Sequence, residues 1–378
     1  WNSPLVPSGE EMVNEPWFFF CCCQQGAESA LKAELARRLP EARFSYSRPG
    51  FCTFKMPAEV APSTVLQLPM VFARTTSISL GRVSGSLLEQ ADEVARIVGQ
   101  QPLDQLHVWK RDSSVPGEGG FQPGPGDEEK QLGGELAEMV LEARQDIFAG
   151  ATVPTANRTA RPGDHVLDCV EVEEGEWWIG WHSASGIASR WAGGVFGRSL
   201  PPHAVSRAYL KMDEAIRWSG IRLQAGDRCA EIGSAPGGSC QALLDRGLKV
   251  IGIDPAEMDE RVVAHESFKH VKKRVADCKR EVFRHVDWLI ADANVAPRYT
   301  LDSIQDIVTH SSVRVRGMLI TLKLLEWKLA DEIPAYLERI RSWGYQDVRI
   351  RQLASNRQEI TMAVLKTRSF RRRVPRRG

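Results

Sequence analysis

Short apolar segments alternate with polar ones over the first 83 residues, after a leader of about 14 residues. The apolar run 17–23 predicts a buried strand, and residues 27–39 predict a helix with Leu31, Leu35 and Leu39 on one face. Further elements are expected at 51–55 (strand), 62–68 (short helix) and 75–80 (strand). This order of short elements predicts a small ferredoxin-like α+β module.

A second unit is predicted from residue 84 to about residue 195. Its elements are a helix at 87–100, a strand at 105–111, a helix at 134–149, and a hairpin of strands 165–173 and 176–182 around Glu174 and Gly175. Residues 112–126 are rich in Gly, Pro and Ser. The segment of about 112–133 is therefore expected to be a flexible insert.

From about residue 200 onward the pattern becomes a regular alternation of strands and helices. The expected strands are 228–232, 250–254, 271–274, 286–292, 317–323, 345–352 and 359–366. Helical crossovers between most of them indicate a doubly wound α/β sheet. Only the short loop 353–358 joins the last two strands, which permits a hairpin and no crossover, so the final strand should run antiparallel.

A glycine-rich turn follows the first of these strands and indicates a bound nucleotide-like ligand. Its residues are Gly233, Ser234, Ala235, Pro236, Gly237 and Gly238. No G-x-G-x-x-G can be drawn through them, which disfavours a dinucleotide pyrophosphate. Pro236 stiffens the loop and the two adjacent glycines leave the backbone exposed. A ligand without a pyrophosphate, such as S-adenosylmethionine, fits better, and Asp254 at the end of the second strand suits its ribose hydroxyls.

Composition sets broad limits on what this chain can be. Its length of 378 residues favours two or three domains, and 43% hydrophobic with 26% charged residues is typical of a soluble globular protein. The net charge of +1 gives no evidence for a nucleic-acid partner. Basic residues do cluster at 269–280 and in the tail 368–378. Solvated surface and RNA contact are both open readings of these clusters.

The eight cysteines favour an intracellular protein without a zinc site. Cys21, Cys22 and Cys23 are consecutive and are expected to be small apolar residues of a buried strand, and no C-x-x-C pair occurs. A reducing cytoplasm is the natural compartment. The apolar run 17–23 is too short to span a bilayer, and no cleavable signal precedes it. The chain begins at Trp1 rather than Met, which leaves open an upstream N-terminus.

Four charged residues are expected to converge at one edge of the sheet. Lys211 lies on a helix before the first strand, Asp292 ends the fourth strand and Lys323 ends the fifth. Glu359 begins the last strand, which reaches the same edge because that strand is antiparallel. Taken one at a time, each of these residues is most simply interpreted as an ordinary surface charge. That interpretation is weaker for Lys323, because Lys323 ends a buried apolar run, where a charge is usually paired or functional.

The carboxy-terminal half resembles the FtsJ/RrmJ class of RNA ribose 2′-O-methyltransferases, whose hallmark is a Lys-Asp-Lys-Glu tetrad. The four residues match it in order, together with the Ala-Pro-Gly-Gly turn at 235–238. The whole chain is most similar to the RlmM-type 23S ribosomal RNA cytidine 2′-O-methyltransferases, which carry a ferredoxin-like module and a THUMP RNA-binding domain before the catalytic domain. Ser206, Arg207 and Lys211 also match that group.

The resemblance implies a domain layout, a methyl donor and an RNA substrate. The domains would be 1–83, a THUMP-like module at 84–195, an FtsJ-like domain at 200–367 and a basic tail at 368–378. S-adenosylmethionine would be the donor, ribosomal RNA of the 23S type the partner, and no metal or membrane is implied. Asp277 would contact the adenine, with Ser206 a weaker contact. Ser239 departs from the family, which often has an aromatic residue there, and the loop after Asp292 departs as well.

The chemistry of ribose methylation explains the need for these residue types. A 2′-hydroxyl is a poor nucleophile at neutral pH, so it must be positioned and deprotonated. Lys323 is the candidate base, although only about one free lysine in 10³ is neutral at pH 7. Burial and Lys211 are expected to lower its pKa. Asp292 and Glu359 are expected to orient the two lysines, and Asp292 also to face the donor.

Other functions remain open on the sequence alone. A non-catalytic RNA-binding protein that keeps the fold is one alternative, and a methyltransferase acting on tRNA or another RNA is a second. Methylation of a base or of a small molecule is disfavoured because neither an Asn-Pro-Pro-Tyr-like motif nor a cysteine nucleophile follows Asp292. The Trp-rich run 177–181 could stack on bases, but packing in a strand is the favoured interpretation.

Overall fold

A computed structural model describes residues 15–99, 102–124, 134–136, 138–140, 142, 156–197 and 199–367. The chain divides into two compact units at Gly197, and each is described by itself. The leader 1–14 and the basic tail 368–378 lie outside the described residues. So do residues 125–133 of the expected insert and most of the expected helix 134–149.

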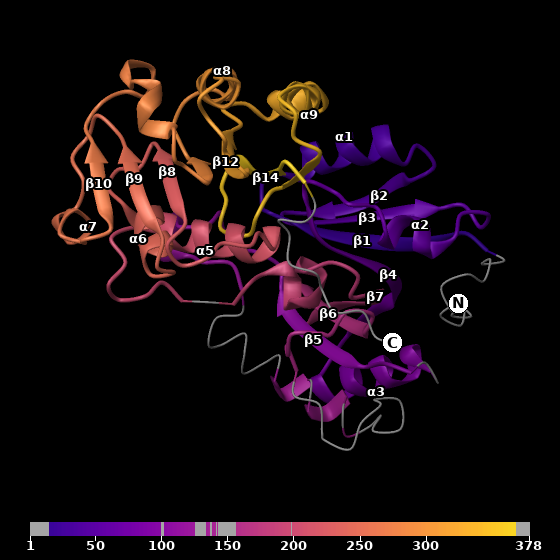
Figure 1. Ribbon diagram of the computed structural model, residues 1–378. Coiled ribbons are helices and arrows are strands. Elements are labelled where there is room, and N and C mark those ends of the chain that lie inside the picture. Colours follow the sequence, from indigo (N-terminus) through magenta and orange to yellow (C-terminus); the bar gives the residue numbers. More distant parts are fainter. Residues whose placement is uncertain are drawn as a thin grey trace. The chain divides into compact units, whose positions relative to one another are not determined.

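The first unit is built on one mixed seven-stranded sheet, in the order β2-β3-β1-β4-β7-β6-β5 (Figure 1). All neighbouring pairs are antiparallel except β5 and β6. The elements are β1 (Trp17–Cys23), α1 (Glu28–Arg38), β2 (Arg43–Arg48), β3 (Phe51–Met56), α2 (Pro62–Leu66), β4 (Ala73–Ser84), α3 (Leu87–Val98), β5 (Gln105–Lys110), β6 (His165–Glu173), β7 (Glu176–Ser183) and the 3-10 turns η1 (Glu118–Gly120), η2 (Ala188–Arg190) and η3 (Ala192–Gly194).

Strand β4 joins the two modules expected from the sequence. It pairs with β1 on one side and with β7 on the other, so the sheet runs on from one expected module into the next. The expected boundary at 83/84 coincides with the end of β4. Within that continuous sheet, the division into ferredoxin-like and THUMP-like modules stays a prediction.

Burial in the first unit confirms the interpretation of its apolar residues. The three consecutive cysteines are buried in β1. Trp177 and Trp181 are buried in β7, as packing in a strand requires. Trp178 is only partly buried and stacks on Tyr46, with the ring centroids 5.6 Å apart.

The second unit is the doubly wound sheet expected from the sequence, with strand order β10-β9-β8-β11-β12-β14-β13 (Figure 1). Its elements are α5 (Ala208–Ser219), β8 (Arg228–Ile232), α6 (Gly238–Leu244), β9 (Lys249–Ile253), α7 (Glu260–Val263), β10 (Phe268–Val271), β11 (Trp288–Ala291), α8 (Pro297–Val308), β12 (Gly317–Lys323), α9 (Ile333–Ser342), β13 (Asp347–Arg351), β14 (Glu359–Leu365) and the 3-10 turns η4 (Val275–Asp277), η5 (Arg280–Phe283) and η6 (Trp327–Glu332).

The direction of the strands confirms the expected hairpin at the end of this sheet. The strands from β10 to β12 pair in parallel, whereas β14 is antiparallel to both of its neighbours. The third strand lies at Phe268–Val271 rather than at 271–274, because the exposed charges of residues 272–274 follow it instead of filling it.

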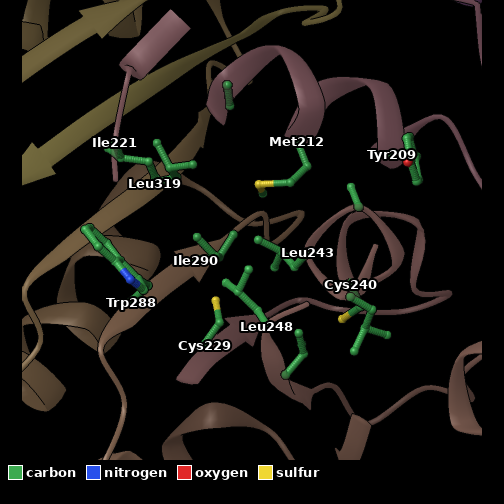
Figure 2. Packing of buried hydrophobic residues seen from close by; sticks show 14 of the residues in the cluster. Tyr209, Met212, Ile221, Cys229, Cys240, Leu243, Leu248, Trp288, Ile290 and Leu319 are labelled. Carbon is green, nitrogen blue, oxygen red and sulfur yellow. The ribbon is translucent and has the colours of Figure 1, made fainter. Parts of the chain in front are cut away.

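The core of the second unit lies between its sheet and the helices α5 and α6. Met212 of α5 and Leu243 of α6 pack onto Cys229, Trp288 and other buried residues of the central strands (Figure 2). The strand order reverses between β8 and β11, and ligands of such sheets bind at the carboxyl ends of the strands at that point. Among the described residues, no helix combines the length and the hydropathy that a bilayer crossing requires.

Candidate active site

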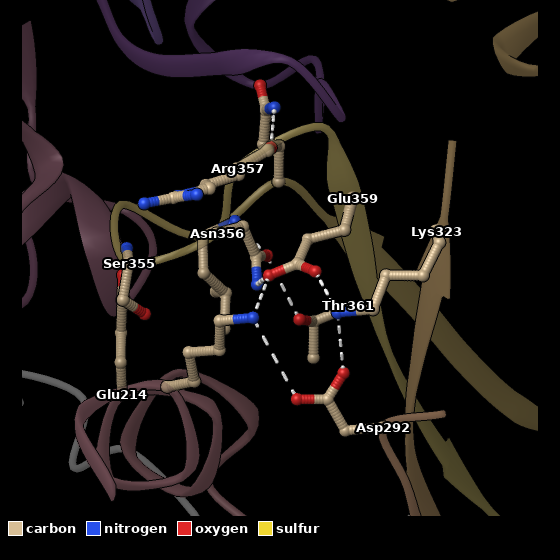
Figure 3. A network of polar contacts seen from close by, with 11 residues as sticks. Glu214, Asp292, Lys323, Ser355, Asn356, Arg357, Glu359 and Thr361 are labelled. Atoms are coloured by element: carbon tan, nitrogen blue, oxygen red, sulfur yellow. Dashed lines mark hydrogen bonds and ion pairs between the residues drawn. The ribbon is translucent and has the colours of Figure 1, made fainter. Parts of the chain in front are cut away.

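The structure brings the four predicted charged residues together in one closed ring (Figure 3). The Lys323 ammonium lies 2.8 Å from Asp292 Oδ1, and that of Lys211 lies 3.8 Å from Asp292 Oδ2. Glu359 contacts both lysines, with Oε1 toward Lys211 and Oε2 toward Lys323. All four side chains are at most 19% exposed. Two ammonium groups and two carboxylates thus form a mostly buried ring that is formally neutral.

Strand pairing explains why Glu359 reaches this ring. Lys323 is the last residue of β12 and Glu359 the first of β14, and the antiparallel register sets them directly opposite each other. Asp292 follows β11, the parallel neighbour of β12 on the other side. Lys211 comes from the first turn of α5. A parallel β14 would have placed Glu359 at the far edge of the sheet.

A buried amide holds the Glu359 carboxylate in place. Asn356 Nδ2 donates to Glu359 Oε1 at 3.3 Å. Asn356 Oδ1 in turn accepts from Thr361 Oγ1 at 3.0 Å and from the Leu353 N–H at 2.8 Å. Asn356 and Thr361 are both buried, so this shell restricts where the carboxylate can point.

The loop between β13 and β14 is also tied to α5. The Glu214 carboxylate accepts from the backbone N–H groups of Ala354 and Ser355, each at 2.8 Å (Figure 3). Glu214 lies three residues after Lys211, on the same face of the helix. Two contacts therefore fasten α5 to the start of β14.

The charges of the ring set the pKa of its members. Burial raises the pKa of Glu359, but Lys211 and Lys323 outweigh it, and the net shift is downward. Burial lowers the pKa of Lys323, but Asp292 and Glu359 outweigh it, and the net shift is upward. The expectation that burial and Lys211 lower the pKa of Lys323 is therefore wrong for this arrangement. Two carboxylates contact its ammonium directly, and their attraction exceeds both opposing effects.

The glycine-rich turn packs tightly against two other segments. Gly233 has φ 78°, and a Cβ there would lie 2.8 Å from Asp292 O. A Cβ on Gly238 would lie 2.8 Å from Ser206 O. The peptide bond from Ala235 to Pro236 is cis. The turn is thus seated between the loop that precedes α5 and the end of β11, directly beside Asp292.

Polar groups around the turn could bind a ligand that carries hydroxyl and amino groups. The Asp254 carboxylate accepts from the N–H groups of Ala235 at 3.1 Å and Ala256 at 2.8 Å. Each carboxylate oxygen can accept a further hydrogen bond. Ser206 Oγ is buried and has no hydrogen-bond partner among the described residues. An orphaned buried hydroxyl beside the turn is the kind of group that a bound ligand would satisfy.

Two other predicted donor contacts are placed differently. Asp277 is exposed at the end of η4, the 3-10 turn after β10. Ser234 is buried, and its hydroxyl donates to Met258 Sδ at 3.5 Å. The backbone of Ser234 belongs to the turn, but its side chain already has a partner.

Sequence reasoning missed one buried acid close to the turn. Glu231, in β8, is buried, and Cys240 Sγ donates to its Oε2 at 2.9 Å. Burial raises the pKa of Glu231 to about 8, and the charges of Asp292 and Asp254 add to that effect. An acid inside an apolar strand was the available signal. Among the described residues, no three His, Cys, Asp or Glu side chains are grouped to hold a metal ion.

Residues 204–333 match the FtsJ-like methyltransferase family, which confirms the resemblance to that family expected for the carboxy-terminal half. The matched residues include three members of the ring and the glycine-rich turn, whereas Glu359 lies beyond them. The doubly wound sheet is therefore a methyltransferase fold of the Rossmann-like kind.

Relatives of similar sequence extend beyond this domain. The chain is 30% identical to Ribosomal RNA large subunit methyltransferase M of Azoarcus sp. (strain BH72), over 54% of this chain and 58% of that protein. It is 26% identical to the protein of the same description from Xanthomonas campestris pv. campestris (strain B100), over 92% of this chain and 98% of that protein. The Azoarcus match thus spans less than two thirds of that relative's length.

A solved structure with similar coverage is TrmN from Thermus thermophilus, with 13% identity and a TM-score of 0.33 over 93% of this chain and 99% of that one. A score this low adds nothing to the fold, which the strand order and the family match establish.

Proposed function

We propose that this chain, through its FtsJ-like methyltransferase domain, methylates a ribose 2′-hydroxyl of ribosomal RNA with S-adenosylmethionine as the donor. The observation that carries the proposal is the ring of Lys211, Asp292, Lys323 and Glu359 beside the glycine-rich turn. The names of the relatives support large-subunit ribosomal RNA as the substrate. The cytoplasm is the proposed compartment for this reaction.

The turn and its neighbours would hold the methyl donor. When bound, S-adenosylmethionine supplies an electrophilic methyl group on a positively charged sulfur. Asp254 has acceptor capacity for ribose hydroxyls, and the orphaned Ser206 Oγ offers a further polar contact. Asp277, exposed after β10, is proposed for the adenine. Because Gly233 has no side chain, the backbone of the turn can lie close to Asp292.

Lys323 is proposed as the group that takes the proton from the 2′-hydroxyl. To act as a base, its Nζ must lose a proton, and the raised pKa in the ring opposes this. A positive charge set beside the ring would lower that pKa, because like charges disfavour the ammonium form. Direct contacts with Asp292 and Glu359 keep Nζ at a fixed point. Such positioning can supply a large part of the rate acceleration.

Exposed side chains that follow ring residues in the chain support an RNA acceptor. Val295 and Tyr299 follow Asp292 along the chain, and Leu325 follows Lys323; all three are exposed. Arg298 lies over the Tyr299 ring, with its guanidinium carbon 5.2 Å from the centroid. Exposed aromatic and arginine faces are surfaces on which nucleobases stack. The first unit is proposed to bind the RNA, as the resemblance implies.

The proposal is tested with labelled donor and unmodified RNA. The wild-type protein should transfer label to RNA as a 2′-O-methylnucleoside, and Lys323→Ala should bind the donor without transferring label. Lys249→Ala, which removes an exposed lysine at the start of β9, is the matched control and should behave as wild type. A base-methylated product would contradict the ribose assignment. RNA binding without transfer by the wild type would favour the non-catalytic alternative.

A further inference from the structure

Two arginines lie close in the chain to members of the neutral ring. Arg207 is the N-cap residue of α5, four residues before Lys211. Arg357 is exposed on the loop between β13 and β14, two residues before Glu359 (Figure 3). The Lys211–Glu359 ion pair joins these two segments. Each arginine is thus set close in the chain to one partner of that pair.

The face of α5 that meets the loop contains Arg207. Arg207, Lys211 and Glu214 are spaced by four and three residues, which places them on one side of a helix. Lys211 contacts Glu359, and Glu214 binds the backbone of Ala354 and Ser355. Both contacts are to the segment that contains Arg357. Arg207 lies about one helical turn before Lys211, on the same side of the helix.

The electrostatics agree with this placement. Burial and the charge of Arg357 lower the pKa of the Arg207 guanidinium, and Glu359 opposes them. Arg207 therefore interacts electrostatically with Arg357 of the loop and with Glu359 at the start of β14. The like charges of Arg207 and Arg357 repel each other, and an anion that binds both arginines converts this repulsion into attraction.

Ribose methylation brings an anion to this place. The 2′-hydroxyl and the 3′-phosphate sit on neighbouring carbons of the ribose, so an acceptor bound at Lys323 carries a phosphate close to the ring. The ring is formally neutral and does not balance that charge. Arginine suits the task because its planar fork can bind phosphate through two hydrogen bonds.

We propose that Arg207 and Arg357 together bind the phosphodiester on the 3′ side of the target ribose and so fix its 2′-hydroxyl at Lys323. This inference rests on the proposed ribose methylation. It predicts that the enzyme recognises the charge of one linkage beside the modified nucleotide. The pair forms no bond with the reacting atoms, and it acts by positioning the ribose.

The test compares two substrates that differ in one linkage. The first is an RNA fragment containing the mapped target nucleotide. The second is identical, except for an uncharged methylphosphonate at its 3′ linkage. On natural RNA, Arg207→Gln and Arg357→Gln should each lower kcat/KM by about 10- to 100-fold, the value of a hydrogen bond to a charged group. Wild type should lose a similar factor on the methylphosphonate RNA, and the variants should lose little more.

The control and the contrary results are distinct. Arg341→Gln removes an exposed charge at the end of α9 and should leave both rates unchanged. Donor binding by each variant, measured by calorimetry, checks that the domain is folded. Variants with wild-type kinetics, or with equal losses on both substrates, would overturn the phosphate assignment while ribose methylation stands. A wild-type protein that never methylates ribose would overturn both proposals.

Discussion

Replacing Glu359 by glutamine tests whether the ring is a buried charge network. Glu359 is 3% exposed and contacts both lysines, so the substitution changes the ring from neutral to a net positive charge. Removing one partner of a buried ion pair costs about 3–5 kcal/mol, because the remaining charge is left without compensation. Gln keeps the shape and an acceptor for Asn356, and Asp292 still faces both lysines. We therefore expect a loss of about 3 kcal/mol in the free energy of unfolding.

The loss should also depend on pH in a defined direction. Because the pKa of Glu359 is lowered in the folded state, its contribution is complete above its unfolded pKa of ~4.3. This contribution to stability is lost as the pH falls toward the pKa of Glu359 in the folded protein. The difference in stability between wild type and Glu359→Gln should therefore be full at pH 7 and should shrink below about pH 4.3.

Urea unfolding at several pH values measures this difference. Glu257→Gln is the matched control, since it removes a carboxylate that pairs with Lys272 at the exposed surface of the same unit. That control should leave stability close to wild type, because exposed ion pairs contribute little. If Glu359→Gln matched the Glu257→Gln control at pH 7, or if its deficit were the same in acid, the ring would not be the coupled network described above.

Three further predictions concern the turn, the base and the buried acid. Gly238→Ala should abolish donor binding in calorimetry, because the new methyl group meets the backbone of Ser206, whereas Gly197→Ala, with open space around it, should not. The rate of methyl transfer by wild type should rise between pH 7 and pH 9, because the pKa of Lys323 is raised and more of it becomes neutral; a flat profile in single-turnover kinetics would argue against Lys323 as the base. Burial raises the pKa of Glu231 to about 8 in the folded protein, whereas the pKa is ~4.3 in the unfolded chain. Wild-type stability should therefore fall as pH rises from ~4.3 to about 8, because Glu231 ionises in the unfolded chain and not in the folded protein. Glu231→Gln should flatten this slope in urea titrations.

The sequence predicted most of the second unit because its signals are local. Buried runs such as the one that ends at Lys323 identify strands, and a six-residue loop before Glu359 is enough to set the direction of the last one. Strand direction then implies which side chains share an edge. That is why four residues far apart in the sequence could be expected to meet.

Features that depend on distance or on long-range pairing were not accessible in this way. The upward shift in the pKa of Lys323 follows from two contacting carboxylates, and a sequence pattern does not give their separations. Strand β2 was missed because it is an edge strand without a buried face. The continuous sheet of the first unit depends on the pairing of β4 with β7, which are almost a hundred residues apart.

If the site at Lys323 serves to methylate a ribose hydroxyl, the methylated atom in the product must be the ribose 2′-oxygen. RNA treated with the protein and labelled donor is digested to nucleosides, and the labelled product is identified by mass spectrometry. We expect a single 2′-O-methylnucleoside with wild type and none with a Lys323→Ala variant that still binds the donor. Label on a base, or an undiminished ribose product from Lys323→Ala, would contradict it.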